Sequence, residues 1–377
     1  MAPPEGTIRL GLIGCGRVAW ERHLPALRHV AGIRLAAVAD TDRERAAALA
    51  RAAPACTVAA DYRALLARGD IDAVGVLTPT ATHAQIGCAA LEAGKHLLIE
   101  KPLALSVEEC ESLIARAAAT PKIVVVGFNL RWHRLVRRAR AWIAAGRLGA
   151  LRGVRSTYTH FRDGTQAPDW HRRLALGGGV SFNEAVHHFD LWRYLLGCEI
   201  EELASFHRAS EHFEDETHAT TARLSAGVVG TGFFSFTTAP DSEVEVYGEA
   251  GRLALSCYRF DGLRFFPHSR YPGDLTMRAR NLLAALPETG RFLTAARRGG
   301  DFQATFVGLW NHFAACIRAG QPSECRLVDG ARALQAALAA RDSARGGHPV
   351  RIEPLRAGQV EAHAVSGDTA GETRERD

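Results

Sequence analysis

The sequence predicts an α/β protein with two sheets of different kinds, and three observations lead to this prediction. The chain has 377 residues, of which 47% are hydrophobic, enough for more than one core. Residues 7–126 alternate short, continuously apolar strand candidates with amphipathic helix candidates, a pattern typical of a parallel sheet covered on both faces. Between residues 200 and 266, strand candidates follow one another without helices, which indicates a mainly antiparallel sheet.

The first part predicts a doubly wound parallel sheet, because strand and helix candidates succeed one another regularly. The strand candidates are residues 7–13, 33–39, 57–59, 73–77, 96–99 and 122–126, and the helix candidates are residues 42–53, 81–93 and 107–118. Asp61 and Ser106 stand where N-caps are expected, and Gly94 follows a helix candidate as a C-cap would. We therefore expect residues 1–127 to form the first domain.

Residues 128–354 are expected to form a C-terminal α/β domain with a large, mainly antiparallel sheet. Helix candidates span residues 133–145, 180–196, 301–319 and 327–343, and further strand candidates span residues 151–161 and 350–352. Two hairpins are predicted, one joining residues 217–224 to 228–237 and one joining 243–247 to 253–258. Residues 163–179 are expected to be a loop, and residues 267–300 a flexible loop or short helices. The polar tail, residues 355–377, is expected to be disordered.

Composition argues against several classes of function. The longest apolar runs have the length of strands, so no transmembrane helix is expected, and residues 1–9 lack the features of a secretory signal. Eight cysteines without a Cys-x-x-Cys pair are expected to be reduced thiols of a cytoplasmic protein. The net charge is +5, and its densest basic run, residues 134–140, fits a solvated helix face better than a nucleic-acid site. No spacing typical of metal ligands occurs, so no metal is predicted.

A glycine motif after the first strand candidate predicts a dinucleotide site. Gly14 permits a tight turn, Gly16 lets the backbone approach a pyrophosphate, and Ala19 allows close packing of the next helix. The free N–H groups at the start of that helix, where Arg17 and Val18 lie, favour phosphate binding. Together these features predict a Rossmann domain.

An acidic residue at the end of the second strand candidate indicates which dinucleotide binds. Asp40 is placed to accept hydrogen bonds from the adenosine ribose and to repel a 2′-phosphate, so NAD is favoured. Arg43 and Arg45 follow closely and keep NADP open as the alternative. Thr78 and Pro79, after the fourth strand candidate, are expected to line the dinucleotide. His83 is either part of that lining or a satisfied residue of the next helix.

With Glu100-Lys101-Pro102, the chain resembles the glucose-fructose oxidoreductase / inositol dehydrogenase / rhizopine catabolism (Gfo/Idh/MocA) family. Four segments carry the resemblance, which covers residues 7 to about 352: Gly-Leu-Ile-Gly-Cys-Gly-Arg-Val-Ala from residue 11, Thr-Pro-Thr-Ala-Thr-His from residue 78, Glu-Lys-Pro from residue 100, and Gly-Gly-Gly-Val-Ser-Phe-Asn-Glu-Ala-Val-His-His-Phe-Asp from residue 177. The resemblance implies a Rossmann domain followed by an α/β domain whose open sheet often mediates homodimers or homotetramers.

The resemblance also assigns the catalytic residues. Lys101 matches the lysine that contacts the reacting oxygen of the substrate, and the bond before Pro102 is a candidate cis peptide. His187 matches the family histidine, which we expect to exchange a proton near neutral pH. Asn183 stands where the family often has aspartate, and an amide can orient substrate but cannot take a proton. Glu184 is expected to point elsewhere on a regular helix.

Further residues are placed by the same resemblance. Asn129 and Arg131 stand at substrate-lining positions, together with Lys101, Asn183 and His187. Glu100, Lys101 and Trp170 are expected beside the cofactor, with Trp170 near the nicotinamide.

The function that the resemblance implies is an NAD(P)-dependent oxidoreductase acting on a polyhydroxylated small molecule. Hydride would pass between the nicotinamide and a secondary alcohol or ketone of a sugar, sugar derivative or cyclitol. Two other classes stay open: a glycoside hydrolase with a retained NAD, and a dinucleotide-binding regulator without catalysis. Neither a nucleic acid nor a membrane is expected as a partner.

Overall fold

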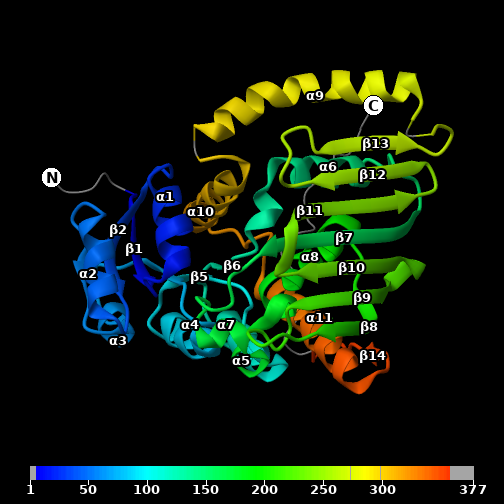
Figure 1. The fold of residues 1–377 in the computed structure, drawn as a ribbon. Helices are drawn as coiled ribbons and strands as arrows, with labels where there is room; N and C mark the ends of the chain where they lie inside the picture. Colours follow the sequence, from blue (N-terminus) through cyan, green and yellow to red (C-terminus); the bar gives the residue numbers. More distant parts are fainter. Residues whose placement is uncertain (1–5, 272, 298, 357–377) are drawn as a thin grey trace, which may run out of the picture.

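The computed structural model describes residues 6–271, 273–297 and 299–356. A parallel sheet formed by the N-terminal part of the chain lies beside a larger sheet formed by the later part (Figure 1). The predicted disordered tail lies outside the described residues, except for residues 355 and 356.

The six strands of the first sheet are all parallel and include every strand predicted for this part. They are β1 (Ile8–Ile13), β2 (Ile33–Ala39), β3 (Thr57–Val58), β4 (Ala73–Val76), β5 (His96–Ile99) and β6 (Val124–Val126). Their order, β3-β2-β1-β4-β5-β6, is that of a Rossmann sheet. Every residue of β4 is buried, as expected for a strand covered on both faces.

The helices of this part are α1 (Leu24–Leu27), α2 (Arg43–Arg51), α3 (Tyr62–Leu66), α4 (His83–Glu92) and α5 (Val107–Ala118). Two of them, α3 and α5, begin at the N-caps that the sequence predicts. The side chain of Asp61 accepts a hydrogen bond from the Ala64 N–H, and that of Ser106 accepts one from the Glu109 N–H. Gly94 has a φ of +69° just after α4, which is the left-handed conformation of a helix end.

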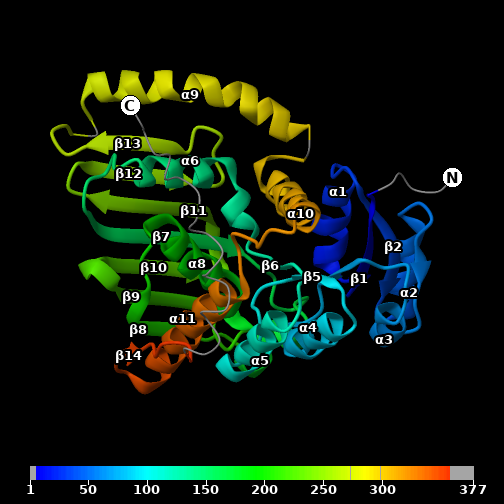
Figure 2. The same ribbon diagram turned by 180° about the vertical axis from the view of Figure 1, so that it is seen from behind.

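The second sheet has eight strands and is mainly antiparallel. They are β7 (Leu151–Phe161), β8 (Ile200–Arg208), β9 (Thr217–Leu224), β10 (Val229–Ser235), β11 (Thr237–Gly248), β12 (Gly251–Ser256), β13 (Leu263–Pro267) and β14 (Val350–Arg351), in the order β13-β12-β11-β7-β10-β9-β8-β14. Both predicted hairpins are confirmed, and β10 pairs with β7 in parallel. Helices α6 (Arg134–Ala144), α8 (Val186–Leu196) and α11 (Leu327–Gly346) cover one face, and the other face is open (Figures 1 and 2).

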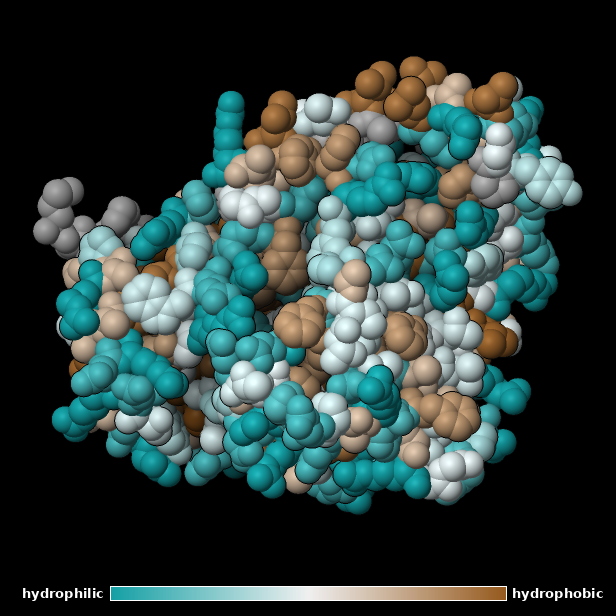
Figure 3. Space-filling view, in the orientation of Figure 1, coloured by the Kyte–Doolittle hydropathy of each residue, from teal (hydrophilic) through white to brown (hydrophobic). Residues whose placement is uncertain are grey.

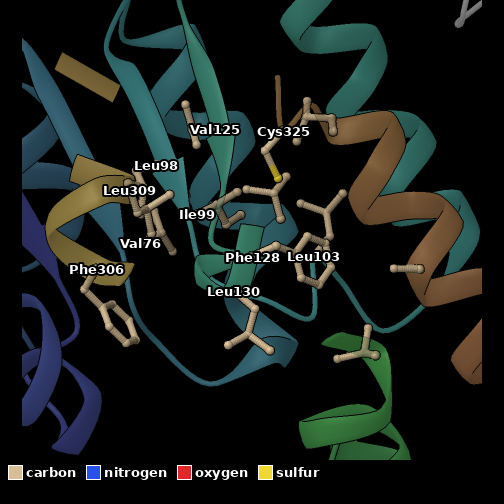
Figure 4. Close-up of a cluster of buried hydrophobic side chains, with 14 of the residues drawn as sticks. Val76, Leu98, Ile99, Leu103, Val125, Phe128, Leu130, Phe306, Leu309 and Cys325 are labelled. Atoms are coloured by element: carbon tan, nitrogen blue, oxygen red, sulfur yellow. The ribbon is translucent and has the colours of Figure 1, made fainter. Parts of the chain in front are cut away.

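Two helices from the end of the chain connect the sheets. Phe306 and Leu309 of α10 (Asp301–Ala319) lie in a buried cluster with Val76 and Leu98 of the parallel sheet (Figure 4). Helix α11 contacts α8 and β8 on one side and α5 on the other. The relative position of the two sheets therefore depends on the packing of these helices. No helix in the described parts of the chain has the length and apolar composition needed to cross a membrane.

Residues 267–300 differ from the prediction, because most of them form one helix, α9 (Leu275–Ala296). Its N-cap is Asp274, whose side chain accepts a hydrogen bond from the Thr276 N–H at 2.9 Å. Pro287 lies inside the helix, and this residue together with Gly290 concealed the helix in the sequence. Five leucines of this helix are exposed: Leu275, Leu282, Leu283, Leu286 and Leu293. Hydrophobic side chains gather along the top edge of the molecule in Figure 3, where α9 runs in Figure 1.

A second difference concerns the segments next to the family motif of three glycines. The predicted loop at residues 163–179 contains two short helices, α7 (Asp169–Arg172) and the 3₁₀ turn η4 (Leu174–Leu176). The predicted helix at residues 180–196 starts with a π-helical turn, η5 (Ser181–Ala185), before α8 begins. The wider π turn changes the direction of every side chain within it.

A buried ion pair holds the turn after β6 against the helices of the second sheet. Arg131, on the short helix η3 (Asn129–Trp132), makes two hydrogen bonds to Asp190 of α8, at 2.8 and 2.5 Å. Its Nη2 also lies 3.3 Å from Asp329 of α11. The side chains of Arg131 and Asp190 are only 3% and 1% exposed, so each charge depends on the other.

The change Asp190→Asn keeps the size of the side chain and removes its charge. Because the buried Arg131 then lacks its bidentate partner, we expect the free energy of unfolding to fall by about 3–5 kcal/mol, measured by urea denaturation. The change Asp169→Asn is the matched control, since it affects an exposed pair with Arg173. It should cost less than about 1 kcal/mol, and equal losses in both variants would contradict the assignment.

Candidate active site

The loop after β1 fits the phosphates of a dinucleotide. Gly14 has a φ of +96°, and a Cβ there would lie 2.7 Å from the backbone of Leu77, so no side chain fits. At Gly16 a Cβ would meet no atom within 4 Å, which leaves open space in front of the loop. The next helix begins with a π turn, η1 (Ala19–His23), in which Ala19 is fully buried. Gly14, Gly16 and Ala19 therefore fit the pyrophosphate of the predicted dinucleotide, NAD.

Asp40 lies at the end of β2 and holds this loop in place. Its Oδ2 accepts a hydrogen bond from the Cys15 N–H at 2.6 Å, and its Oδ1 accepts one from the Asp42 N–H at 2.8 Å. The carboxylate is therefore held beside the glycine loop, where the adenosine ribose is expected. Arg17 is exposed and pairs with Glu21 at 2.8 Å, and Val18 is half-buried.

His83 joins two loops of the crevice. One ring nitrogen, Nδ1, lies 2.8 Å from the carbonyl oxygen of Pro102, and Nε2 lies 2.8 Å from that of Thr78. The side chain is buried, so both its nitrogens are engaged with the backbone. Of the two readings that the sequence left open, these contacts favour the satisfied helix residue. Thr78 is half-buried and Pro79 is exposed, as residues that line a crevice can be.

Glu100 ends β5 in a buried hydrogen-bonded chain. The Trp310 Nε1–H donates to Nδ1 of His23 at 3.1 Å, so Nε2 of His23 carries the hydrogen that faces Glu100 Oε1 at 3.0 Å. Burial alone would raise the pKa of the Glu100 carboxyl, but the hydrogen bonds from His23 and the Lys101 backbone, together with the charge of Lys101, outweigh it and lower that pKa. Glu100 also accepts the backbone N–H of Lys101 at 3.0 Å, which orients the next residue.

Lys101 reaches from the parallel sheet to the helix behind the second sheet. Its Nζ donates a hydrogen bond to the backbone oxygen of Asn183 at 2.5 Å. The bond between Lys101 and Pro102 is cis, as the sequence suggested. Burial lowers the pKa of Lys101, and the negative charges of Glu184 and Glu100 oppose this effect. A lysine with a lowered pKa can hold and release a proton closer to neutral pH.

The π turn η5 decides which side chains face Lys101. Asn183 is buried, and its Nδ2 donates to the Gly179 oxygen at 2.7 Å, so its amide is engaged within its own turn. Glu184 lies close to β7 instead, with Oε1 3.5 Å from Nη2 of Arg162. The expectation that Glu184 points away on a regular helix is therefore wrong. Asp215 supports the start of the turn by accepting the Ser181 N–H at 2.9 Å.

His187 lies near Lys101, as predicted, and its ring packs edge-on against Phe128 with centroids 5.8 Å apart. Burial, followed by the charge of Lys101, lowers its pKa well below the ordinary value. The imidazole is therefore neutral at pH 7 and can exchange hydrogen bonds, which differs from the near-neutral titration that we expected.

Three residues of the cleft were not singled out from the sequence. They alternate along the end of β7, so their side chains point to the same face of the strand. The three are Tyr158 and His160 in the strand and Arg162 directly after it. Arg162 donates to Nε2 of His171 at 3.1 Å and lies 3.4 Å from Nε2 of His160. Period-two spacing of polar and aromatic residues at the end of a strand was the available signal.

The remaining predicted residues divide into two groups. Asn129 is buried, and its Nδ2 donates to the hydroxyl of Thr305 at 2.7 Å, while Arg131 belongs to the buried ion pair with Asp190. These contacts give both residues structural roles, and a contact of either with substrate stays a prediction. Trp170 on α7 is half-buried, with its ring centroid 5.0 Å from that of His171, and its place beside the nicotinamide also stays a prediction.

Buried histidines around the cleft make the fold sensitive to acid. Burial lowers the pKa of His188 from 6.5 to about 3 and that of His171 to about 2. Below pH 6.5 the unfolded chain therefore binds more protons than the folded one, so the free energy of unfolding falls as pH decreases from 6.5 toward 4. Urea denaturation as a function of pH measures this slope. It should be shallower in His188→Phe, and unchanged in the exposed control His29→Phe; an unchanged slope in His188→Phe would contradict the assignment.

Comparisons with known proteins place the chain among oxidoreductases. Residues 8–128 match the family described as "Oxidoreductase family, NAD-binding Rossmann fold", and residues 136–254 match the "GFO/IDH/MocA C-terminal domain". The chain is 28% identical over 365 residues to scyllo-inositol 2-dehydrogenase (NAD(+)) of Bacillus subtilis (strain 168), covering 94% of this chain and 98% of that protein.

Two further dehydrogenases are similar to this chain, one in sequence and one in structure. Inositol 2-dehydrogenase 3 of Saccharopolyspora erythraea is 31% identical over 261 residues, which cover 66% of this chain and 73% of that protein. The structure of levoglucosan dehydrogenase in complex with NADH superimposes with a TM-score of 0.77 at 22% identity, over 92% of this chain and 100% of that one. With its glycine loop, Glu-Lys-Pro turn and second-domain histidine, the chain belongs to the Gfo/Idh/MocA family of NAD-binding oxidoreductases.

Proposed function

We propose that this oxidoreductase transfers hydride between NAD and a secondary alcohol or ketone of a sugar, sugar derivative or cyclitol. The observation that carries the proposal is the position of Lys101, which lies two residues after the end of β5 and reaches η5 near His187. The names of two relatives, which are inositol dehydrogenases, support a polyhydroxylated substrate.

In this proposal the chain supplies proton handling and orientation. NAD, when bound, supplies the hydride acceptor. Lys101 holds the reacting oxygen of the substrate and takes its proton during oxidation, or returns it during reduction. The neutral imidazole of His187 orients the same oxygen or a neighbouring hydroxyl by hydrogen bonding. Glu100 fixes the backbone of Lys101 by accepting its N–H. The contact of the His83 ring with the carbonyl oxygen of Pro102 fixes the turn that follows.

We further propose the architecture and setting that the sequence suggests. Residues 1–127 form the cofactor domain and residues 128–354 the substrate domain, with α10 and α11 packed across their boundary. The open face of the second sheet would join copies of this chain in a homodimer or homotetramer, which is supported by the exposed side chains of Phe161, Phe206 and Val229. The eight free thiols support a reducing compartment such as the cytoplasm.

The change Lys101→Met tests the proposed reaction, because it removes the ammonium group and roughly keeps the volume. Turnover should fall by about 10²–10⁴-fold while NADH binding, followed by fluorescence, stays intact. Lys122→Met, at a half-exposed position away from the cleft, is the matched control and should keep wild-type turnover.

The measurement is NADH absorbance with a panel of cyclitols, aldoses and nucleotide sugars. Unchanged turnover in Lys101→Met would remove this residue from the mechanism. Product formed by the wild type without net NADH would favour the glycoside hydrolase. NAD binding without turnover on the whole panel would favour the regulator.

Asp40 is expected to make NADH bind more tightly than NADPH, because its carboxylate repels a 2′-phosphate. The change Asp40→Asn should narrow this preference, which titration with both coenzymes measures. Asp42→Asn is the matched control, since Asp42 caps α2 two residues away and should leave the ratio of affinities unchanged. Tighter binding of NADPH to the wild type would overturn the assignment.

A further inference from the structure

The residue whose backbone accepts the hydrogen bond from Lys101 has an amide side chain and no carboxylate. The amide of Asn183 carries no charge, is only 5% exposed, and donates to the carbonyl oxygen of Gly179 at 2.7 Å. It contacts Lys101 only through its backbone oxygen, which accepts the hydrogen bond from Nζ. The half-buried ammonium therefore takes its negative counter-charge from another residue.

Glu184 brings a carboxylate to this part of the cleft from the next position in the chain. The π turn Ser181–Ala185 directs it toward β7, where its side chain is only 12% exposed. Its Oε1 lies 3.5 Å from Nη2 of Arg162 and 3.9 Å from Nε2 of His160. Both distances exceed those of a good hydrogen bond, so the charge of Glu184 is not fully satisfied by either partner.

The charged groups around Lys101 come from several elements and act in opposite directions. Glu100, the preceding residue, is negative, but its oxygens accept hydrogen bonds from His23 and from the Lys101 backbone. Arg162 on β7 is positive and repels the ammonium. The other titratable groups near Lys101, Arg162 and Glu184 are His171 on α7, His187 and His188 on α8, Tyr158 and His160 on β7, and Tyr258 after β12. Glu184 directly follows Asn183, whose backbone oxygen accepts the hydrogen bond from Nζ at 2.5 Å, so its carboxylate lies in the same part of the cleft as the ammonium. Its negative charge favours the charged form of Lys101.

We propose that Glu184 is the counter-charge of Lys101, and that it supplies the negative charge which the amide of Asn183 cannot supply. Glu184 is a positioning residue, since it acts through Lys101. Its importance for turnover rests on the proposed function, whereas its effect on the charge of Lys101 can be measured without any substrate.

The direction of that effect follows from Coulomb's law. A carboxylate near an ammonium favours the charged form, so Glu184→Gln should make Lys101 lose its proton at lower pH. Arg162→Gln removes a repelling cation and should move the titration to higher pH. If the two variants move the titration of Lys101 in opposite directions, the cause is their charge, because a general loosening of the cleft would move it in the same direction in both.

The composition of the chain makes this titration practical. Lys95, Lys101 and Lys122 are the three lysines in the sequence. Brief acetylation with acetic anhydride across a pH series, followed by peptide mass spectrometry, reports the neutral fraction of each amine separately. Lys122 is half-exposed and serves as the reference within the same molecule, and Lys95 is buried with its Nζ bonded to the Arg68 and Ile71 carbonyl oxygens.

In Glu184→Gln the midpoint for Lys101 should move by about one pH unit to lower pH, and that for Lys122 should not move. Glu184→Asp, which keeps the charge on a shorter side chain, should return the midpoint toward that of the wild type. Glu245→Gln is the matched control, because Glu245 is also buried and paired with arginines, Arg155 and Arg252, but is not among the groups that act on Lys101. NADH binding and circular dichroism confirm that each variant is folded.

An unmoved midpoint in folded Glu184→Gln would overturn the proposal, and so would an equal shift in Glu245→Gln. If the wild type turned over no polyol but the Lys101 midpoint still shifted, the proposed function would fail and the counter-charge would stand. If turnover occurs, the pH profile of kcat/KM in Glu184→Gln should shift in the same direction as the acetylation profile.

Discussion

The hydrogen bond from Nζ of Lys101 to the backbone oxygen of Asn183, 2.5 Å long, is the contact on which the cleft depends. It joins the end of the parallel sheet to the π turn that precedes α8. For the bond to form, Glu100 must hold the Lys101 backbone, and Asp215 must hold the start of the turn. Helix α11 must also keep the two sheets at a fixed distance, because it packs against β6 of the first and β8 of the second.

Burial is the second constraint, and it gives the cleft its electrostatic character. Histidines that would titrate near neutral pH in water are held neutral, since the interior disfavours their charged form. Lys101 feels the same penalty, and the carboxylates of Glu184 and Glu100 offset part of it. A site of this kind places one lysine with a lowered pKa among neutral histidines and a few opposing charges, which would suit a reaction that moves a single proton together with a hydride.

The parts of the fold that the sequence predicted well are those governed by local chemistry. Continuously apolar strands, the caps at Asp61 and Ser106, and the glycine at position 14 each follow from interactions within a few residues. Helix α9 was missed because Pro287 and Gly290 weaken the local pattern, although Asp274 offered a cap. Arg131 was expected in the cleft, but its partners, Asp190 and Asp329, come from distant helices that no local pattern reveals.

By itself the sequence determined the class of the protein, a Rossmann domain from the glycine loop and Asp40, and through the family resemblance it predicted a lysine and a histidine as the reactive pair. These follow from motifs whose spacing is set by one strand and one turn. Only the tertiary structure decided which carboxylate faces Lys101. The π turn at residues 181–185 engages the Asn183 amide with Gly179 and directs Glu184 to Arg162 on another sheet. Because an inserted residue in a helical turn is stabilised by packing and not by composition, the regular helix drawn from the sequence pointed Glu184 the wrong way.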